Sequence, residues 1–211
     1  KMNLRNIFVL SVLLCTSFLI AQKGSDGSVE RTIETSFDGP KIYDDRAASR
    51  LLYRYQDGKG PLGQLVVSYG RPQWKDEYNE SGAFDYLTRG KVWRLGKDFW
   101  TVLDTSIVLV IGGHNVVLGD YYLGIHRSQD GSDWSLAVID AHQARKLKLD
   151  SASIDQAPIL FKAPAVYEEV NNALDRLAIT LSRPGKPLGD IVLAIVWGNH
   201  KLSVPIKLKL E

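Results

Sequence analysis

The sequence predicts an all-β fold, an antiparallel β-sandwich of about eight strands with a jelly-roll-like arrangement. From residue 62 onward, short apolar runs of strand length are separated by clusters of turn residues. Several of these runs alternate apolar and polar side chains with a period of two, which is the pattern of half-buried strands. Residues 142–149 and 165–173 are the candidate helices, and both segments are short. Short strands at this spacing are typical of sandwiches and barrels.

The apolar runs give the positions of the strands, and the residues between them give the turns. The expected strands are residues 65–69, 102–111, 115–117, 121–126, 134–140, 174–182, 191–197 and 202–210. The Gly-Gly pair at 112–113 predicts a tight hairpin, and the Asp-Gly pair at 130–131 predicts a second turn. We expect the Gly-Asn-His segment at 198–200 to link the last two strands.

Residues 1–21 predict a secretory signal peptide. Lys1 and Arg5 give a basic start, and a nearly unbroken apolar run of about 15 residues ends at Ala21. This run is shorter than the roughly 20 residues that a permanent membrane-spanning helix needs. We therefore expect cleavage after Ala21 and export to the periplasm or the extracellular space, with an uncleaved anchor as the alternative.

Cys15 is the one cysteine of the chain and lies inside this apolar run. Lipidation is a less favoured alternative, because Leu14 is not the small residue that a lipoprotein has before its cysteine. After cleavage no cysteine would remain, which excludes disulfides, thiol catalysis and cysteine-bound zinc in the mature protein.

Two further regions follow the expected signal peptide. Residues 22–61 are polar and predict a flexible N-terminal leader with one short ordered stretch at 47–55. Residues 62–211 contain all the expected strands, so we expect them to form a single β-sandwich domain.

The charge of the chain is balanced. Lys+Arg 26 and Asp+Glu 24 give a formal net charge of +2, and residues 1–21 carry the excess. A neutral mature protein has no overall field that attracts nucleic acid. We expect no nucleic-acid partner and no membrane span once the signal peptide is removed.

No known catalytic or cofactor motif is convincing. Residues 58–63 match the letters of the dinucleotide-binding fingerprint, but a loop precedes them and a strand follows, whereas that motif opens a helix. The four histidines are scattered without metal-ligand spacing. Residues 130–133 have the oxygen-bearing side chains of a calcium loop, but a hairpin turn favours the same residues for backbone reasons and is the preferred interpretation. We therefore expect no catalytic residue, no metal and no cofactor.

The tryptophans are the more informative residues. Trp197 is in phase with a buried strand and is expected in the core. Trp74, Trp93, Trp100 and Trp134 lie near polar or loop segments. They either stack on a sugar or a partner side chain, or seal the ends of the sandwich.

Four short motifs resemble a known bacterial family. They are Tyr-Gly-Arg-Pro at 69–72, Gly-Lys-Val-Trp-Arg-Leu-Gly at 90–96, the Gly-Gly turn at 112–113, and Leu-Gly-Asp-Tyr-Tyr-Leu at 118–123. The sequence is similar to domain-of-unknown-function family 2911, which is common among exported proteins of the Bacteroidetes. The resemblance covers about residues 62–211 and implies an exported β-rich domain without an assigned activity.

Two departures from the family pattern limit what the resemblance carries over. Residues 97–100 read Lys-Asp-Phe-Trp where the family has Ala-Asn-Glu-Ala, and Gly70 replaces a serine. Any role of that Asn or Glu is not transferred, although Asp98 could replace the acid.

These observations give a set of candidate ligand-binding residues. On a strand, Lys91 and Trp93 would share one face and form a small cationic and aromatic patch, whereas a buried Trp93 would favour ion pairs of Arg71 or Arg94 with a nearby acid. The candidates are Arg71, Trp74, Lys91, Trp93, Arg94, Asp98, Trp100 and His126.

The expected function is that of a non-enzymatic binding module of the cell envelope, with a glycan or an envelope protein as the partner. A metal-dependent or hydrolytic enzyme acting on an envelope or glycan substrate, with a site built from Asp98 and His126, is one alternative. A purely structural envelope component is the other.

Overall fold

The computed structural model describes residues 29–37, 45–55, 60–80, 82–185 and 187–210 of the 211-residue chain. The expected signal peptide at residues 1–21 lies outside these residues. Among the described residues, none of the helices has the length and apolar character needed to cross a membrane.

The prediction of an all-β fold is confirmed, and the described residues contain eleven strands rather than about eight. All strand pairs are antiparallel. The strands are β1 (Val29–Phe37), β2 (Arg46–Tyr55), β3 (Pro61–Gly70), β4 (Val92–Arg94), β5 (Thr101–Thr105), β6 (Leu109–Ile111), β7 (His114–Val116), β8 (Gly119–Arg127), β9 (Trp134–Asp140), β10 (Ile159–Ser182) and β11 (Asp190–Leu208). The short helices are the 3-10 turns η1 (Asp76–Asn79) and η2 (Ser151–Gln156) and the α-helices α1 (Ala83–Thr88) and α2 (Ala141–Lys146).

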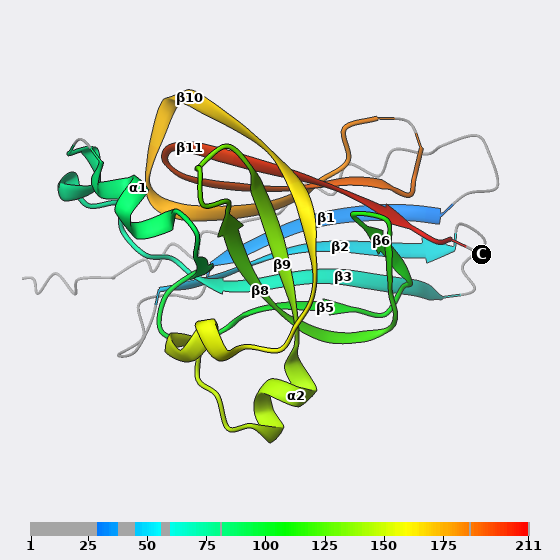
Figure 1. Ribbon diagram of the computed structural model, residues 1–211. Helices are drawn as coiled ribbons and strands as arrows, with labels where there is room; N and C mark the ends of the chain where they lie inside the picture. The colour runs from blue at the N-terminus through cyan, green and yellow to red at the C-terminus, as the bar shows by residue number, and fades with distance from the viewer. Residues whose placement is uncertain (1–28, 38–44, 56–59, 81, 186, 211) are drawn as a thin grey trace, which may run out of the picture.

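The strands form one open sheet in the order β1-β2-β3-β5-β8-β9-β10-β11-β6-β7, and β4 pairs with the second half of β8. β10 and β11 are long enough to cross over the other strands (Figure 1). The first part of β10 pairs with β9, and the rest pairs with β11. Near its end β10 reaches β2, where the Leu181 amide donates to Ser49 Oγ at 2.9 Å. The sheet therefore folds back over itself and encloses the core.

The core consists of the side chains that alternate inward along these strands. On β11, Ile191, Leu193, Ile195 and Trp197 are all buried, as the period of two predicts. Leu181 on β10 faces the same interior. The burial of such apolar side chains stabilises the packing of the two halves of the sheet against each other.

The sheet begins earlier in the chain than the predicted boundary at residue 62. The short ordered stretch expected at 47–55 is the strand β2, and its Leu51 and Tyr53 are fully buried in the main core. The polar appearance of this region comes from the outward-facing residues of β2, such as Arg50, which alternate with the buried ones. Residues 46–55 are thus part of the domain rather than of a leader.

Both helix predictions can be compared with the structure. The helix expected at 142–149 is confirmed as α2, which begins after Asp140, whose side chain accepts from the Gln143 amide at 2.9 Å. The helix expected at 165–173 is wrong, because these residues continue β10: Ala165 pairs with β9, and residues 166–169 pair with β11. The apolar residues in this largely exposed part of β10 have a spacing that resembles the period of a helix.

The turns were predicted with one exception. The Gly112-Gly113 hairpin joins β6 to β7, and both glycines have the positive φ of a type I′ turn, 57° and 84°. The run expected at 102–111 is not one strand but two, since β5 ends at Thr105 and β6 begins at Leu109. The turn expected at 198–200 is absent: these residues lie within β11, where Gly198 has a φ of 60° and pairs with Leu174 at an irregularity of the ladder.

Candidate functional site

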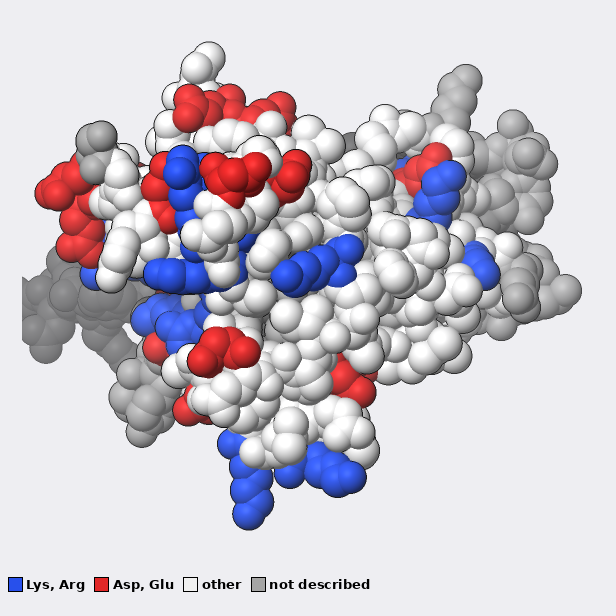
Figure 2. Space-filling model, viewed as in Figure 1, with Lys and Arg blue, Asp and Glu red and all other residues white. Residues whose placement is uncertain are grey.

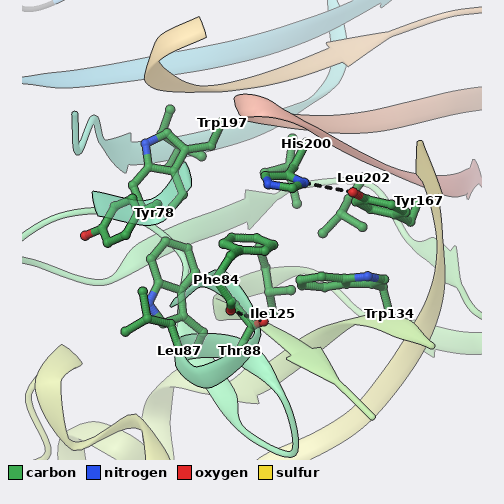
Figure 3. A pocket seen from close by; sticks show the side chains of 13 residues that line it. Tyr78, Phe84, Leu87, Thr88, Ile125, Trp134, Tyr167, Trp197, His200 and Leu202 are labelled. Atoms are coloured by element: carbon green, nitrogen blue, oxygen red, sulfur yellow. Dashed lines mark hydrogen bonds between the residues drawn. The ribbon is translucent and has the colours of Figure 1, made fainter. Parts of the chain in front are cut away.

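A cavity lined almost entirely by aromatic and aliphatic side chains opens between the folded-back sheet and helix α1. Its volume is about 80 Å³. We call it the aromatic pocket (Figure 3). Its lining consists of Tyr78, Phe84, Leu87, Thr88, Trp93, Ile125, Trp134, Tyr167, Leu177, Ile195, Trp197, His200 and Leu202.

Three parts of the fold form the walls of the pocket. η1 and α1 supply one wall, β4, β8 and β9 supply the second, and β10 with β11 supplies the third. On β11, Ile195 and Trp197 precede Gly198, whereas His200 and Leu202 follow it, so the inward phase changes from odd to even residues. The irregularity at Gly198 produces this change, because a bulge re-aims the side chains beyond it. One strand therefore contributes four residues to the pocket.

The rings of the pocket lie against one another at several angles. Trp197 stacks on Trp93, with ring centroids 5.1 Å apart. Trp74, although not itself in the lining, makes an edge-on contact with Trp197 at 4.9 Å. Phe84 lies parallel to His200 at 4.0 Å and so attaches helix α1 to β11. Aromatic pairs add about 0.5–1.5 kcal/mol each beyond the area they bury, so these contacts help to hold the walls together.

A second, more open cavity of about 370 Å³ continues the pocket toward solvent. We call it the polar mouth. It shares Tyr78, Phe84, Trp134, Tyr167 and His200 with the aromatic pocket and adds Asn79, Gly82, Asp85, Arg127, Glu169 and Asn199. A ligand with an apolar end and a polar end would therefore find the matching surface for each.

Arg127 is fixed in the polar mouth by several contacts. Its Nη1 donates to Asp85 Oδ1 at 2.5 Å and to Thr88 Oγ1 at 3.1 Å, and its Nε donates to the Gly131 carbonyl at 2.9 Å. The guanidinium lies over the Trp134 ring, 4.9 Å from the centroid. Its hydrogen bond to Asp85 lowers the pKa of that carboxyl. Asp85 also pairs with Arg89 at 2.7 Å, so two guanidinium groups share this carboxylate.

His200 takes part in a chain of hydrogen bonds along one side of the site. Its Nδ1 lies 2.8 Å from the hydroxyl of Tyr167, and that hydroxyl lies 3.4 Å from Glu169 Oε1 (Figure 3). Burial lowers the pKa of His200 and raises the pKa of Tyr167. Both groups are therefore uncharged at neutral pH.

The low pKa of His200 predicts that the protein loses stability in mild acid. The unfolded chain takes up the proton near the ordinary pKa of about 6.5, whereas the folded chain resists it, so stability falls as pH drops through 6.5. The charged and titratable groups facing His200 are Glu169, Arg127 and Tyr167, and they do not reverse this sign. We expect the melting temperature to fall between about pH 7.5 and pH 5.5.

His200→Gln is expected to reduce this pH dependence, because it removes the titrating group. His142→Gln, at an exposed position of α2, serves as the matched control and should retain it. An unchanged pH dependence in His200→Gln would contradict the prediction.

The chain matches a known protein family over the residues that form the site. The model of a family described as a protein of unknown function, DUF2911, matches residues 56–206. The chain belongs to the DUF2911 family. This confirms the resemblance drawn from its sequence motifs. No curated protein and no solved structure matches the chain. The DUF2911 match contains every residue of the aromatic pocket and of the polar mouth.

Of the eight residues predicted to bind a ligand in this DUF2911 protein, two tryptophans lie at the site. Trp93 lines the pocket, and Trp74 supports it from behind through Trp197. Lys91 lies outside the lining, with its Nζ 4.7 Å from the Tyr86 ring centroid. Trp93 and Lys91 therefore do not form the expected patch on one surface.

The remaining candidates have contacts elsewhere. Arg71 donates to the Leu177 carbonyl at 3.3 Å, and Arg94 contacts Ser151 Oγ at 3.4 Å. Trp100 stacks on Tyr122 in a separate cluster, with centroids 4.6 Å apart. These three side chains hold parts of the fold together.

The enzyme alternative required Asp98 and His126 to meet. Asp98 lies in the turn after β4 with a φ of 61°, and its carbonyl accepts a hydrogen bond from Ser151. His126 contacts Ser135 Oγ at 3.3 Å, on the face of β8 opposite to Ile125 and the pocket. Nothing in the described part of the chain joins the two. The described residues also contain no group of three or more metal-ligating side chains.

The calcium-like loop at residues 130–133 is a turn in the described structure. Both oxygens of Asp130 accept hydrogen bonds within the loop, from Ser128 and Ser132. These bonds lower the pKa of Asp130 to about 2.

Sequence reasoning missed Phe84, Arg127, Tyr167 and His200 as site residues. Phe84 lies on a six-residue helix that no periodicity reveals. Tyr167 lies in the segment interpreted as a helix, and His200 in the segment interpreted as a turn. A long strand hairpin over residues 159–208 would have placed Tyr167 opposite Leu202 and next to His200, as the ladder does.

Proposed function

We propose that this DUF2911 protein is a binding module of the cell envelope that takes one end of a small ligand into the aromatic pocket. The observation that carries the proposal is the continuity of the aromatic pocket with the polar mouth. Concave, mostly apolar sites with a few convergent polar groups are the usual form of a small-molecule site.

The composition of the walls supports a specific site over a packing defect. Trp93, Phe84 and Tyr167 come from segments far apart in sequence and present their rings to one space. Filling this space with side chains would have stabilised the fold, since empty apolar volume costs free energy. An apolar site that costs stability is consistent with selection for binding.

Export is part of the proposal and is supported by the basic and apolar pattern of residues 1–21. If the protein is exported and cleaved, the intact mass of the secreted form equals that of the chain without these residues. A secreted form that retains them would overturn this part.

A dye-binding experiment tests the pocket. N-phenyl-1-naphthylamine is a neutral aromatic dye whose fluorescence rises in apolar surroundings, and we expect saturable binding by residues 22–211. Leu87→Trp should reduce the affinity at least tenfold, because Leu87 lines the pocket and the larger side chain would fill a cavity of about 80 Å³.

Leu147→Trp is the matched control, since Leu147 is an exposed leucine after α2 and lies outside the pocket. This variant should bind the dye like the parent protein. Equal binding by both variants, or no saturable binding at all, would overturn the proposed function.

A further inference from the structure

The lining of the aromatic pocket favours a cation that has no hydrogen-bond donors of its own. The faces of aromatic rings carry negative electrostatic potential, and a cation within about 6 Å of a ring centroid is attracted to it. Tyr78, Phe84, Trp93, Trp134 and Trp197 line the cavity from all three walls. A positively charged group in the cavity would meet several rings at once.

The interior offers few free hydrogen-bonding groups. Thr88 Oγ1 donates to the Phe84 carbonyl at 2.7 Å and accepts from Arg127. The indole of Trp197 donates to the Pro72 carbonyl at 3.0 Å. A sugar placed here would lose hydrogen bonds to water without replacing them, which costs free energy for each hydroxyl. A quaternary ammonium group has no N–H and therefore loses no hydrogen bond to water on entering the pocket.

The polar mouth also contains a carboxylate that can face a cation. Asp85 pairs with both Arg127 and Arg89, and Glu168 pairs with Lys201. Glu169 lines the polar mouth, and no ion pair engages it within the described residues. Figure 2 shows acidic side chains, with some basic ones among them, over η1 and the bend of β10. One carboxylate thus remains available at the entrance.

The volumes of the two cavities indicate which part of a ligand each can hold. A volume of about 80 Å³ is far below the roughly 300–1,000 Å³ of sites that enclose a drug-sized molecule. It admits a compact head group, and the mouth of about 370 Å³ receives what is attached to it.

We infer that the aromatic pocket binds a quaternary ammonium head group, with Glu169 as the counter-charge and the remainder of the ligand in the polar mouth. This inference rests on the proposed function and adds the chemical class of the ligand.

Titration calorimetry with two probes of the same shape tests it. Choline carries a trimethylammonium group, and 3,3-dimethylbutan-1-ol replaces its nitrogen by carbon and is uncharged. We expect choline to bind at least tenfold more tightly than the alcohol, which is the size of a desolvated cation–π interaction. Glu169→Gln should weaken choline binding several-fold and leave alcohol binding unchanged.

Glu168→Gln is the matched control, because Glu168 is the neighbouring carboxylate on β10 and pairs with Lys201 outside the pocket. It should bind choline like the parent protein. Equal affinity for choline and the alcohol would overturn the inference, as would equal effects of the two glutamate substitutions. If neither probe binds while the naphthylamine dye does, the inference fails and the proposed function stands. If the dye also fails to bind, both are wrong.

Discussion

Replacing Trp197 by alanine is expected to lower the free energy of unfolding by about 3–5 kcal/mol. Trp197 is only 8% exposed, stacks on Trp93, and donates its indole N–H to the Pro72 carbonyl. The substitution removes an indole ring that lines the aromatic pocket, and the Pro72 carbonyl loses the hydrogen bond from that indole while it retains the one from the Leu177 amide. Equilibrium unfolding in urea, followed by circular dichroism, measures the loss.

Trp197→Phe separates the two contributions. It retains a ring against Trp93 but loses the hydrogen bond and part of the volume, so a loss of about 1–3 kcal/mol is expected. A loss below about 1 kcal/mol for the alanine variant would show that Trp197 does not anchor the core.

Replacing Gly198 by alanine is expected to cost about 2–4 kcal/mol and to weaken ligand binding. Gly198 has a φ of 60°, which is unfavourable for any residue with a Cβ. A Cβ at this position would also lie 2.6 Å from the Trp74 ring. Because Trp74 supports Trp197, the displaced ring would disturb the pocket wall.

Gly113→Ala is the matched control for this substitution. Gly113 also has a positive φ, 84°, but no atom lies within 4 Å of its added Cβ. Its cost should be limited to the backbone, about 1 kcal/mol. Unfolding curves of both variants, with dye affinity measured on each, give the difference that the Trp74 contact causes. Equal costs would mean that Trp74 moves away freely.

The elements that could be predicted are those determined by residues close together in the sequence. β9 (Trp134–Asp140) has the predicted bounds because its apolar residues lie between clear turn residues. The Gly112-Gly113 hairpin was also predictable, since only glycine adopts its backbone angles easily. In contrast, the middle of β10 is exposed and polar, so no alternation distinguishes it from a helix or a loop.

The site was predicted less well because it depends on pairing between distant segments. Trp74 and Trp93 were identified from their residue type and motif, but Trp100 has the same properties and belongs to another cluster. The register of β10 against β11 brings Tyr167 to His200. That register is a property of the whole hairpin and cannot be read from either residue alone.

The pairing of β6 with the end of β11 has a consequence for the order of assembly. Leu109 lies opposite Leu208, so the hairpin of β6 and β7 finds its neighbouring strand only in β11, much later in the sequence. During synthesis from the N-terminus, this edge of the sheet stays incomplete until β11 has emerged. Closing so long a loop costs conformational entropy before the stabilising contacts form. A high contact order of this kind slows folding. The synthesis of β11 therefore sets the moment at which this sheet can reach its native topology.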